Sequence, residues 1–469
     1  MRQQKKITMK SDVPVPLKSR LLRYKQSDKF TDAPVAHGRL TRMVGLTMEA
    51  VGVRVPIGQQ CKVVLSDKKE IETEVVGFHE NITYLMPVQK VSGLQPGARV
   101  VPMESRHRVS IGSHMRGRIL NGIGQPLDQL GSLESENENY EEPSVTNPLA
   151  REPITMPLDV GVRAINGLLT VGKGQRLGLF AGSGVGKSVL LGMMTKFTQA
   201  DIVVVGLIGE RGREVKEFID HILGTEGLKK AVVVAAPADE APLMRLRAAQ
   251  LSTQIAEHFR SQGKDVLLLM DSLTRFAQAQ REIALSVGEP PATRGYPPSV
   301  FTKIPELVER AGNGNKGEGS ITAFYTVLTE GDDLQDPVAD SARAILDGHI
   351  VLSRQLSEEG IYPAIDIEAS ISRVMPQVVN DAQLQQAQLF KQLLARHRAN
   401  KDLIAIGAYQ KGSDREIDMA IERHPFLLNY IVQGMNESAG FAQSLKGLNS
   451  ALTPSATNPG AQNQAANPQ

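Results

Sequence analysis

The fold is decided by the stretch Ala181-Gly182-Ser183-Gly184-Val185-Gly186-Lys187-Ser188, which lies between a predicted strand over Arg176–Phe180 and a predicted helix over Val189–Phe197. The glycines let successive backbone N–H groups turn towards a phosphate, and the N-terminus of the following helix adds positive potential. Lys187 is placed to reach the β- and γ-phosphates, and Ser188 is placed to ligate Mg²⁺. We therefore predict that residues 181–188 bind ATP with Mg²⁺, in preference to a glycine-rich turn that only packs a helix on a sheet.

The loop departs slightly from the strict phosphate-binding pattern, because Ala181 stands where that pattern begins with Gly. Ala is also small, so this departure costs little. The spacing of Gly182, Gly184 and Gly186 does not fit a dinucleotide-binding fingerprint, which would also leave Lys187 without a role. We therefore set the dinucleotide alternative aside.

Two acidic residues follow other predicted buried strands. Asp271 ends the apolar run Leu267–Met270, where a carboxylate can hold the hydration shell of a nucleotide-bound magnesium ion. Glu210 follows the strand predicted over Ile202–Ile208, and hydrolysis benefits from a carboxylate that orients and polarises water at the γ-phosphate. The alternative for Glu210 is an ion-paired side chain in a charged turn.

The pattern of the whole chain predicts an α/β core with a smaller domain on each side. Apolar strands alternate with helical periodicity in the middle of the chain, which indicates a parallel sheet covered on both faces. Before it, short β-branched stretches predict a small barrel, and after it the spacing of four apolar residues predicts a helical domain. The barrel stretches are 39–47, 61–65, 71–78, 82–86 and 98–101, and the helix face is Leu384, Ala387, Phe390 and Leu394. The predicted boundaries are 1–25 for a basic extension, 26–104 for the barrel, 105–376 for the ATPase domain, 377–448 for the helical domain and 449–469 for a disordered tail.

Composition excludes several classes of protein. The 469 residues suffice for roughly two to four domains, and 41% hydrophobic and 22% charged residues are typical of a globular protein. The net charge is only +2, which gives no global field for binding nucleic acid. Cys61 is the single cysteine, so the chain cannot form an internal disulfide, and no apolar run is long enough to span a bilayer. We expect a cytoplasmic protein.

The three site motifs, in this order, resemble those of the catalytic subunits of the rotary ATP synthase. Further stretches resemble the flagellum-specific ATPase of the bacterial type III export apparatus, and they lie at residues 294–310, 331–343, 361–373 and 407–414. The likeness runs from about residue 31 to residue 447. It implies an α/β fold with a P-loop (RecA-like) ATPase core, flanked by an N-terminal small β-barrel and a C-terminal helical domain.

The resemblance also implies roles for single residues. Lys187, Ser188 and Asp271 would bind phosphate and Mg²⁺, and Glu210 would activate water. The other implied roles are a γ-phosphate contact for Arg211, packing on adenine for Tyr362, and an arginine finger that crosses a subunit boundary for Arg373. One chain would thus hold both the catalytic glutamate and the finger, which points to a homohexamer with six equivalent sites.

The implied function is that of the ATP-hydrolysing motor of flagellar protein export. Such a motor couples hydrolysis to the delivery or unfolding of flagellar subunits and to the release of their chaperones at the export gate. The implied partners are a regulator, a central stalk protein, membrane proteins of the gate and chaperone–substrate complexes, at the inner membrane of the flagellar base. The basic segment 1–25 suggests docking to an acidic partner or to anionic lipid, with a solvated terminus as the alternative.

Three alternative functions share parts of this pattern. A virulence-type secretion ATPase would have the same fold and chemistry but would serve an injectisome. An RNA-driven hexameric translocase is disfavoured because the predicted barrel strands contain only two aromatic residues, Phe78 and Tyr84, whereas a barrel that stacks bases would have more. A regulatory subunit of a rotary machine that binds nucleotide without hydrolysing it is disfavoured by Glu210.

Overall fold

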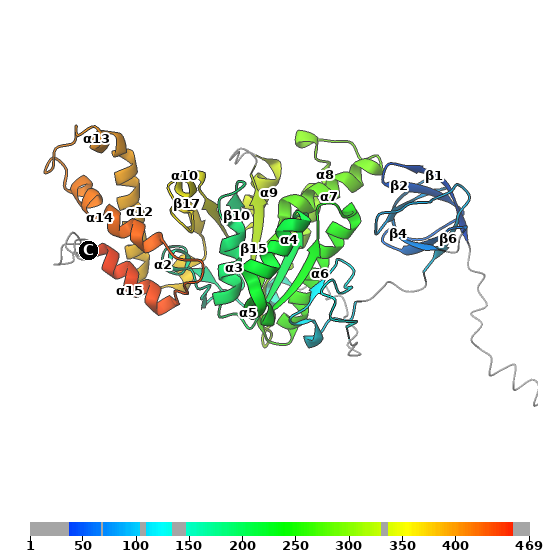
Figure 1. Ribbon diagram of the computed structural model, residues 1–469, viewed down its shortest axis with the longest axis horizontal. Coiled ribbons are helices and arrows are strands. Elements are labelled where there is room, and N and C mark those ends of the chain that lie inside the picture. Colours follow the sequence, from blue (N-terminus) through cyan, green and yellow to red (C-terminus); the bar gives the residue numbers. More distant parts are fainter. Residues whose placement is uncertain (1–36, 67–68, 104–108, 134–146, 330–335, 454–469) are drawn as a thin grey trace, which may run out of the picture.

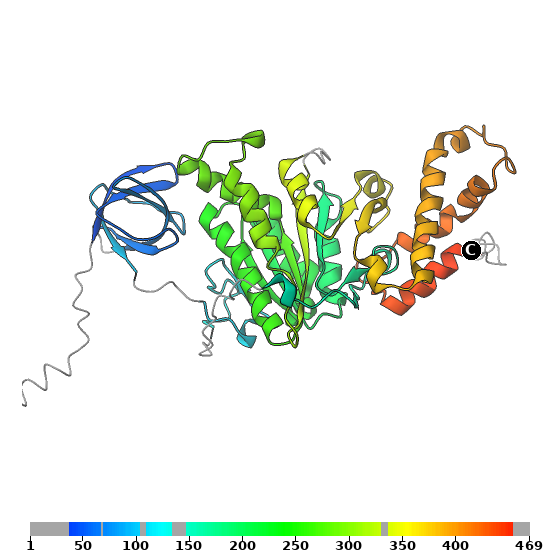
Figure 2. The same cartoon turned by 180° about the vertical axis from the view of Figure 1, so that it is seen from behind.

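The computed structural model describes residues 37–66, 69–103, 109–133, 147–329 and 336–453. The chain forms three bodies in a row, namely a β-barrel, a central α/β body and a group of helices (Figure 1). The same order is seen from behind (Figure 2). The basic segment 1–25 and residues 454–469 of the predicted tail lie outside the described residues.

The barrel contains six strands in the closed order β1-β2-β5-β4-β3-β6. Their bounds are Gly38–Val44 for β1, Thr47–Val51 for β2, Gln60–Val64 for β3, Glu70–His79 for β4, Ile82–Pro87 for β5 and Arg99–Pro102 for β6. The predicted stretch 39–47 divides at Gly45, whose φ of 57° favours glycine, so it supplies β1 and the start of β2. Cys61 is fully buried in the barrel core together with Met48, Val63 and Leu85. The predicted barrel is confirmed.

The central body is built on one sheet with the strand order β17-β16-β10-β15-β13-β11-β12-β7. The bounds are Ile119–Leu120 for β7, Arg176–Ala181 for β10, Ile202–Ile208 for β11, Ala231–Ala236 for β12, Asp265–Asp271 for β13, Ser320–Leu328 for β15, Gly348–Leu352 for β16 and Ile365–Ser372 for β17. Neighbours in this order are parallel, except that β16 and β17 are antiparallel. Short strands flank the sheet: β14 (Gly312–Asn313) pairs with β15, and β8 (Pro157–Leu158) pairs with β9 (Val171–Gly172). The carboxyl ends of β10, β11 and β13 therefore lie at one edge, where the loops that follow them meet.

Helices cover both faces of this sheet, because each central strand is apolar on both sides. In β11, Val203 and Val205 face one buried cluster, while Val204 and Ile208 face the other. The helices of the central body are α2 (Arg163–Leu168), α3 (Lys187–Phe197), α4 (Gly212–Glu217), α5 (Gly224–Lys229), α6 (Pro242–Ser261), α7 (Leu273–Ser286), α8 (Pro298–Val308), α9 (Pro337–Ile345), α10 (Arg354–Glu358) and α11 (Met375–Val378). A π-helical turn, Phe218–Leu223, joins α4 to α5. The predicted α/β core with both faces covered is confirmed.

The third body consists of α12 (Asp381–Ala399), α13 (Lys401–Ala405), α14 (Arg415–Ile431) and α15 (Phe441–Leu452). The side chain of Asn380 caps α12 by accepting a hydrogen bond from the Gln383 N–H at 2.9 Å. Of the predicted helix face, Ala387 and Phe390 are buried, while Leu384 and Leu394 are half-buried. The helix α15 runs into the segment predicted as a tail, because Ala451 and Leu452 continue its buried face.

No helix in the described ranges is both long enough and apolar enough to cross a membrane.

Candidate active site

The phosphate loop occupies residues 182–186, between the end of β10 and the start of α3. Gly184 and Gly186 have φ values of 79° and 89°, a region that side chains other than glycine rarely adopt. Open space surrounds Gly184, so its backbone conformation and not crowding requires glycine there. Ser183 and Gly184 are exposed, while Gly182 and Val185 are buried. The predicted sequence of strand, glycine loop and helix is therefore present at the carboxyl edge of the sheet.

Ala181 is the last residue of β10 and is 1% exposed. Its carbonyl oxygen accepts a hydrogen bond from the N–H of Thr329 at 3.2 Å, next to the end of β15. This bond ties the start of the loop to the neighbouring strand. Ala181 is thus part of the strand and not of the turn. This agrees with the expectation that Ala in place of the usual glycine has little effect on phosphate binding.

Lys187, the first residue of α3, joins the two predicted acidic residues of the site. Its Nζ lies 2.6 Å from Asp271 Oδ1 and 2.9 Å from Glu210 Oε1. The three side chains are only 12%, 4% and 14% exposed, in the order Lys187, Asp271 and Glu210, so this ion cluster is largely shielded from water. Burial by itself lowers the pKa of Lys187, but the two carboxylates outweigh it and raise that pKa above its ordinary value. Lys187 is therefore cationic between two carboxylates at the foot of the phosphate loop.

The carboxylate of Asp271 has a second partner. The hydroxyl of Thr326, in the adjacent strand β15, donates to Asp271 Oδ1 at 2.6 Å. Burial raises the pKa of Asp271, and this effect opposes that of the nearby Lys187. The sequence analysis missed Thr326, because a threonine within an apolar strand carries no signal unless the neighbouring strand is known.

These residues fit a magnesium ion that is bound with a nucleotide. Ser188 lies in the first turn of α3, and Asp271 ends β13, so a hydroxyl and a carboxylate stand at the same edge of the sheet. Oxygen ligands of these kinds are the ones that Mg²⁺ prefers. The ammonium group of Lys187 between two carboxylates also shows that a positive charge is stabilised at this place.

Tyr362 lies beside the phosphate loop, although it is far away in the sequence. A Cβ atom on Gly186 would lie 3.4 Å from two ring carbons of Tyr362. Tyr362 is 44% exposed as a residue, its hydroxyl lies 2.8 Å from Ser357 Oγ, and its carbonyl oxygen accepts from the N–H of Gln433 at 2.8 Å. The residue predicted to contact adenine therefore lies near the loop and is partly exposed to solvent.

Two arginines that were predicted for the site lie outside the cluster around Lys187. Arg211 precedes α4, and its side chain is 83% exposed and 3.3 Å from Glu214. Arg373 follows β17, and its guanidinium donates to the carbonyl oxygens of Leu346 and Arg343 at 3.2 and 3.5 Å. Arg211 is thus sequence-adjacent to Glu210 but points elsewhere.

The position of Arg373 follows from strand register. Ser372 pairs with Gly348, and His349 pairs with Gly178 near the start of β10. The phosphate loop follows the other end of β10, and a strand rises roughly 3.3 Å per residue. Ser372, which is level with the start of β10, is therefore separated from the phosphate loop by about 10 Å or more along the sheet. Arg373 is exposed and lies at the end of the sheet opposite to its own phosphate loop.

Arg275, in α7, is a further residue near the site that the sequence analysis did not single out. Gly209, which precedes Glu210, has a φ of 71°, and a Cβ there would lie 2.7 Å from the Cβ of Arg275. The Arg275 Nε atom is buried and has no hydrogen-bond partner among the described residues. Gly209 thus permits close packing of an arginine against the turn that carries Glu210.

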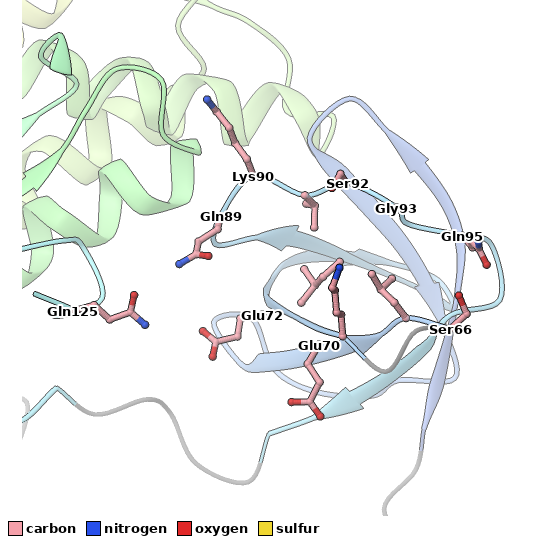
Figure 3. A pocket seen from close by; sticks show the side chains of 13 residues that line it. Ser66, Glu70, Glu72, Gln89, Lys90, Ser92, Gly93, Gln95 and Gln125 are labelled. Atoms are coloured by element: carbon pink, nitrogen blue, oxygen red, sulfur yellow. The ribbon is translucent and has the colours of Figure 1, made fainter. Parts of the chain in front are cut away.

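A separate pocket of about 680 Å³ lies on the barrel (Figure 3). It is lined by polar side chains of both charges, among them Glu70, Glu72 and Lys90, and by Gln125 from the segment that follows the barrel. None of its lining residues belongs to the phosphate loop or to the cluster around Lys187. The candidate nucleotide site at the edge of the central sheet is therefore separate from this pocket.

Two family models match the chain. Residues 161–372 match the nucleotide-binding domain of the ATP synthase alpha/beta family. Residues 379–450 match the C-terminal domain of the type III secretion ATPase EscN. The first match contains Lys187, Glu210, Asp271 and Tyr362, and it ends one residue before Arg373.

Curated relatives cover nearly the whole chain. A flagellum-specific ATP synthase of Pseudomonas aeruginosa is 62% identical, and the match covers 92% of this chain and 97% of the relative. A flagellum-specific ATP synthase of Salmonella typhimurium is 57% identical, with coverage of 88% of this chain and 92% of the relative.

Solved structures of a related ATPase share the fold. The assembled ATPase EscN from the type III secretion system of enteropathogenic E. coli is 42% identical, with a TM-score of 0.83 over 89% of this chain and 100% of that chain. EscN in complex with its central stalk EscO gives a TM-score of 0.80 at the same identity and coverage.

Proposed function

Because this chain belongs to the flagellum-specific ATP synthases of the ATP synthase alpha/beta family, we propose that it is the ATPase that drives flagellar type III protein export. The observation that carries the proposal is the cluster in which Lys187 Nζ contacts both Asp271 and Glu210 beneath the phosphate loop. The cluster puts a phosphate-binding cation, a metal-binding carboxylate and a second carboxylate in one place. These are the parts that phosphoryl transfer to water requires.

In this proposal the triphosphate lies in the loop formed by residues 181–188. The main-chain N–H groups of the loop and the ammonium of Lys187 stabilise the phosphate oxygens, while Ser188 and Asp271 hold Mg²⁺, which neutralises charge on the β- and γ-phosphates. Glu210 accepts a hydrogen bond from water and orients its oxygen towards the γ-phosphorus. When nucleotide binds, Lys187 turns from the carboxylates to the phosphates, which frees Glu210 for this role. Tyr362 packs on the adenine.

Arg373 completes the site of a neighbouring copy. Its guanidinium lies at the opposite end of the sheet from the phosphate loop of its own chain and is exposed, so it can serve a site only across a subunit boundary. A positively charged side chain supplied in this way can raise turnover by roughly 10³ to 10⁵. The assembled state of the related EscN supports a ring of identical chains. Arg211 would contact the γ-phosphate after it leaves Glu214.

The work done by hydrolysis is the delivery or unfolding of flagellar subunits and the release of their chaperones at the export gate. EscN binds a central stalk, EscO, and the same architecture supports a stalk partner for this chain. We further propose contacts with an export regulator, with membrane proteins of the gate and with chaperone–substrate complexes. The place of action is the cytoplasmic side of the inner membrane at the flagellar base.

Service in an injectisome is the second candidate, because EscN belongs to a virulence secretion system. The identities favour flagellar service, since the two flagellum-specific relatives are 62% and 57% identical and EscN is 42% identical. Deletion of the gene distinguishes the two functions. We expect loss of flagellar filaments with normal effector secretion, and the reverse result would assign the protein to an injectisome.

The central test measures ATPase rate per chain against protein concentration, with the mass of the assembly determined in the presence of nucleotide. We expect the rate to rise as rings form. A Glu210→Gln variant should assemble and bind ATP but turn over at least roughly 10²-fold more slowly. Hydrolysis by this variant at the wild-type rate would refute the proposed mechanism. Glu217→Gln, at an exposed residue of α4, is the matched control.

A further inference from the structure

We propose that Gln175 is a positioning residue for Arg373. Its buried side-chain amide determines the position of the Arg373 guanidinium in each chain. The inference rests on the proposed function, because it assumes that Arg373 acts in the site of a neighbouring copy. Gln175 immediately precedes β10 and is 0% exposed. It is a polar side chain at the amino end of the sheet, far from the phosphate loop that follows β10.

The amide of Gln175 contacts both groups that hold the backbone of Arg373. Its Nε2 donates to Ser372 Oγ at 3.0 Å and to the carbonyl oxygen of Asp347 at 3.1 Å. That same carbonyl accepts the backbone N–H of Arg373 at 3.0 Å. One NH₂ group therefore fixes the residue before Arg373 and also the acceptor of the Arg373 N–H.

The orientation of this amide is determined by its other end. Gln175 Oε1 accepts from the N–H of Gly172 at 2.9 Å, so the carbonyl side of the amide faces Gly172 and the NH₂ side faces Ser372. Both polar atoms of the side chain are therefore used inside a dry environment. Loss of the amide would remove the acceptor of the Gly172 N–H and the donor to both Ser372 Oγ and the Asp347 carbonyl oxygen.

Arg373 needs such support because it directly follows an edge strand. β17 is the last strand of the sheet and pairs only with β16, and the register of that pair shifts between His349 and Val351. The side chain of Arg373 is exposed, and its guanidinium is held in its own chain by hydrogen bonds to the carbonyl oxygens of Leu346 and Arg343. A displacement of a reacting or charge-stabilising group by about 1 Å can cost roughly 10²-fold in rate. The buried hydrogen bonds at its root therefore matter for turnover.

The same network reaches the helical body. Ser372 Oγ donates to the carbonyl oxygen of Thr170 at 2.8 Å, and the hydroxyl of Thr170 accepts from Gln383 Nε2 at 2.9 Å. Gln383 lies in the first turn of α12 and is 4% exposed. A continuous line of buried hydrogen bonds thus joins the first helix of the third body to the residue before Arg373.

A purely structural role for Gln175 predicts a different result from a positioning role. A residue that only supports the fold affects stability or assembly. The fold-reduction in turnover caused by its substitution then multiplies with the reduction caused by substitution of Arg373. A residue that acts through Arg373 lowers the turnover of the ring, leaves the KM for ATP unchanged, and has no further effect once Arg373 is removed.

The test compares Gln175→Met, Arg373→Ala and the double variant as assembled full-length chains. Met keeps the length and volume of Gln but cannot donate or accept as the amide does. We expect Q175M to lower kcat roughly ten- to a hundredfold at constant KM, and the double variant to match R373A alone. Ser252→Ala is the control, because Ser252 is fully buried and its hydroxyl donates only to the Ala248 carbonyl of its own helix.

The possible failures are distinguishable. If the fold-reductions in kcat of Q175M and R373A multiply in the double variant, or if Q175M turns over like wild type, the inference is wrong. The proposed role of Arg373 as an arginine finger is not affected by either result. If R373A leaves the turnover of the ring unchanged, the finger in the proposed function is wrong and the inference falls with it. If Q175M does not assemble, Ser372→Ala removes a single oxygen from the same network, and the same comparison with R373A decides.

Discussion

Thr326 and Lys187 both donate to the same oxygen, Oδ1 of Asp271, and each does so at 2.6 Å. The two donors come from different elements, β15 and α3, and meet at the end of β13 that carries the carboxylate. The orientation of Asp271 is thus determined before any nucleotide binds. Thr326 is 0% exposed, so water cannot replace its hydroxyl.

Replacement of Thr326 by Val should lower the apparent affinity of the ATPase for Mg²⁺. Loss of a group that orients a metal-binding carboxylate typically costs roughly 10- to 100-fold in metal affinity or activity. We expect the Mg²⁺ concentration for half-maximal ATPase rate to rise roughly tenfold in T326V. Thr326→Ser keeps the hydroxyl and should behave like wild type. An unchanged magnesium titration in T326V would remove Thr326 from the site.

Replacement of Lys187 by Ala should affect stability as well as turnover. Asp271 and Glu210 would face each other without a cation, and loss of one partner from a buried pair costs roughly 3 kcal/mol. We expect K187A to unfold at lower denaturant concentration, with ATPase activity reduced more than roughly 10²-fold. Adding Glu210→Gln should recover part of the stability but none of the activity.

The control for this prediction is Lys229→Ala, because Lys229 pairs with Glu226 on the surface, where both side chains are more than half exposed. K229A should match wild type in both measurements. If K187A and the K187A/E210Q double variant unfolded at the same denaturant concentration, the three side chains would not form a coupled charge cluster.

Replacement of Tyr362 by Ala should raise the KM for ATP with little change in kcat. Stacking of an aromatic side chain on a base contributes roughly 1–3 kcal/mol, which corresponds to about tenfold or more in affinity. Tyr362→Phe keeps the ring and loses only the contact of the hydroxyl with Ser357, so its KM should stay near that of wild type. A fall in kcat of Y362A at constant KM would contradict adenine packing.

The stability of the helical body should fall in acid because of two stacked histidines. The rings of His397 in α12 and His424 in α14 lie 3.5 Å apart at 10°. Burial and the neighbouring His397 lower the pKa of His424 to about 4, although Glu359 opposes this, and burial lowers the pKa of His397. In the unfolded chain both should titrate near the ordinary value of roughly 6.5.

The sign follows from proton uptake. Below about pH 6.5 the unfolded chain binds protons that the folded chain does not bind until about pH 4, so stability is lost as the pH falls through this window. We expect the Tm to drop between pH 7 and pH 5, and His424→Phe, which keeps a stacked ring, to reduce that drop. Equal pH dependence in the variant and wild type would show that His424 is not responsible.

The cluster around Lys187 was largely predictable from the sequence, because parallel strands carry their loops at one edge. Glu210 and Asp271 each follow an apolar run that is too short for a buried helix, and the register confirms that β11 and β13 are neighbours, with Leu207 opposite Asp271. The loop glycines have a backbone requirement that their sequence pattern already expresses. Local chemistry was therefore sufficient for this part of the site.

Other features could not be derived from local patterns. Thr326 contacts Asp271 only because β15 lies next to β13, and strand order is a property of the whole sheet. The resemblance implied a γ-phosphate contact for Arg211, but the side chain of Arg211 is exposed and lies beside Glu214. Likewise, the division of the stretch 39–47 at Gly45 depends on a turn that joins two barrel strands.

The closed order of the barrel limits how copies of this chain can adhere to one another. Each of its six strands has a hydrogen-bonded neighbour on both sides, so no free strand edge is offered to the barrel of another copy. Adjacent barrels must therefore meet through side chains and cannot merge into one continuous sheet. The strength of such contacts depends on the side chains at the barrel surface, so substitutions there can change how copies associate without altering the barrel itself.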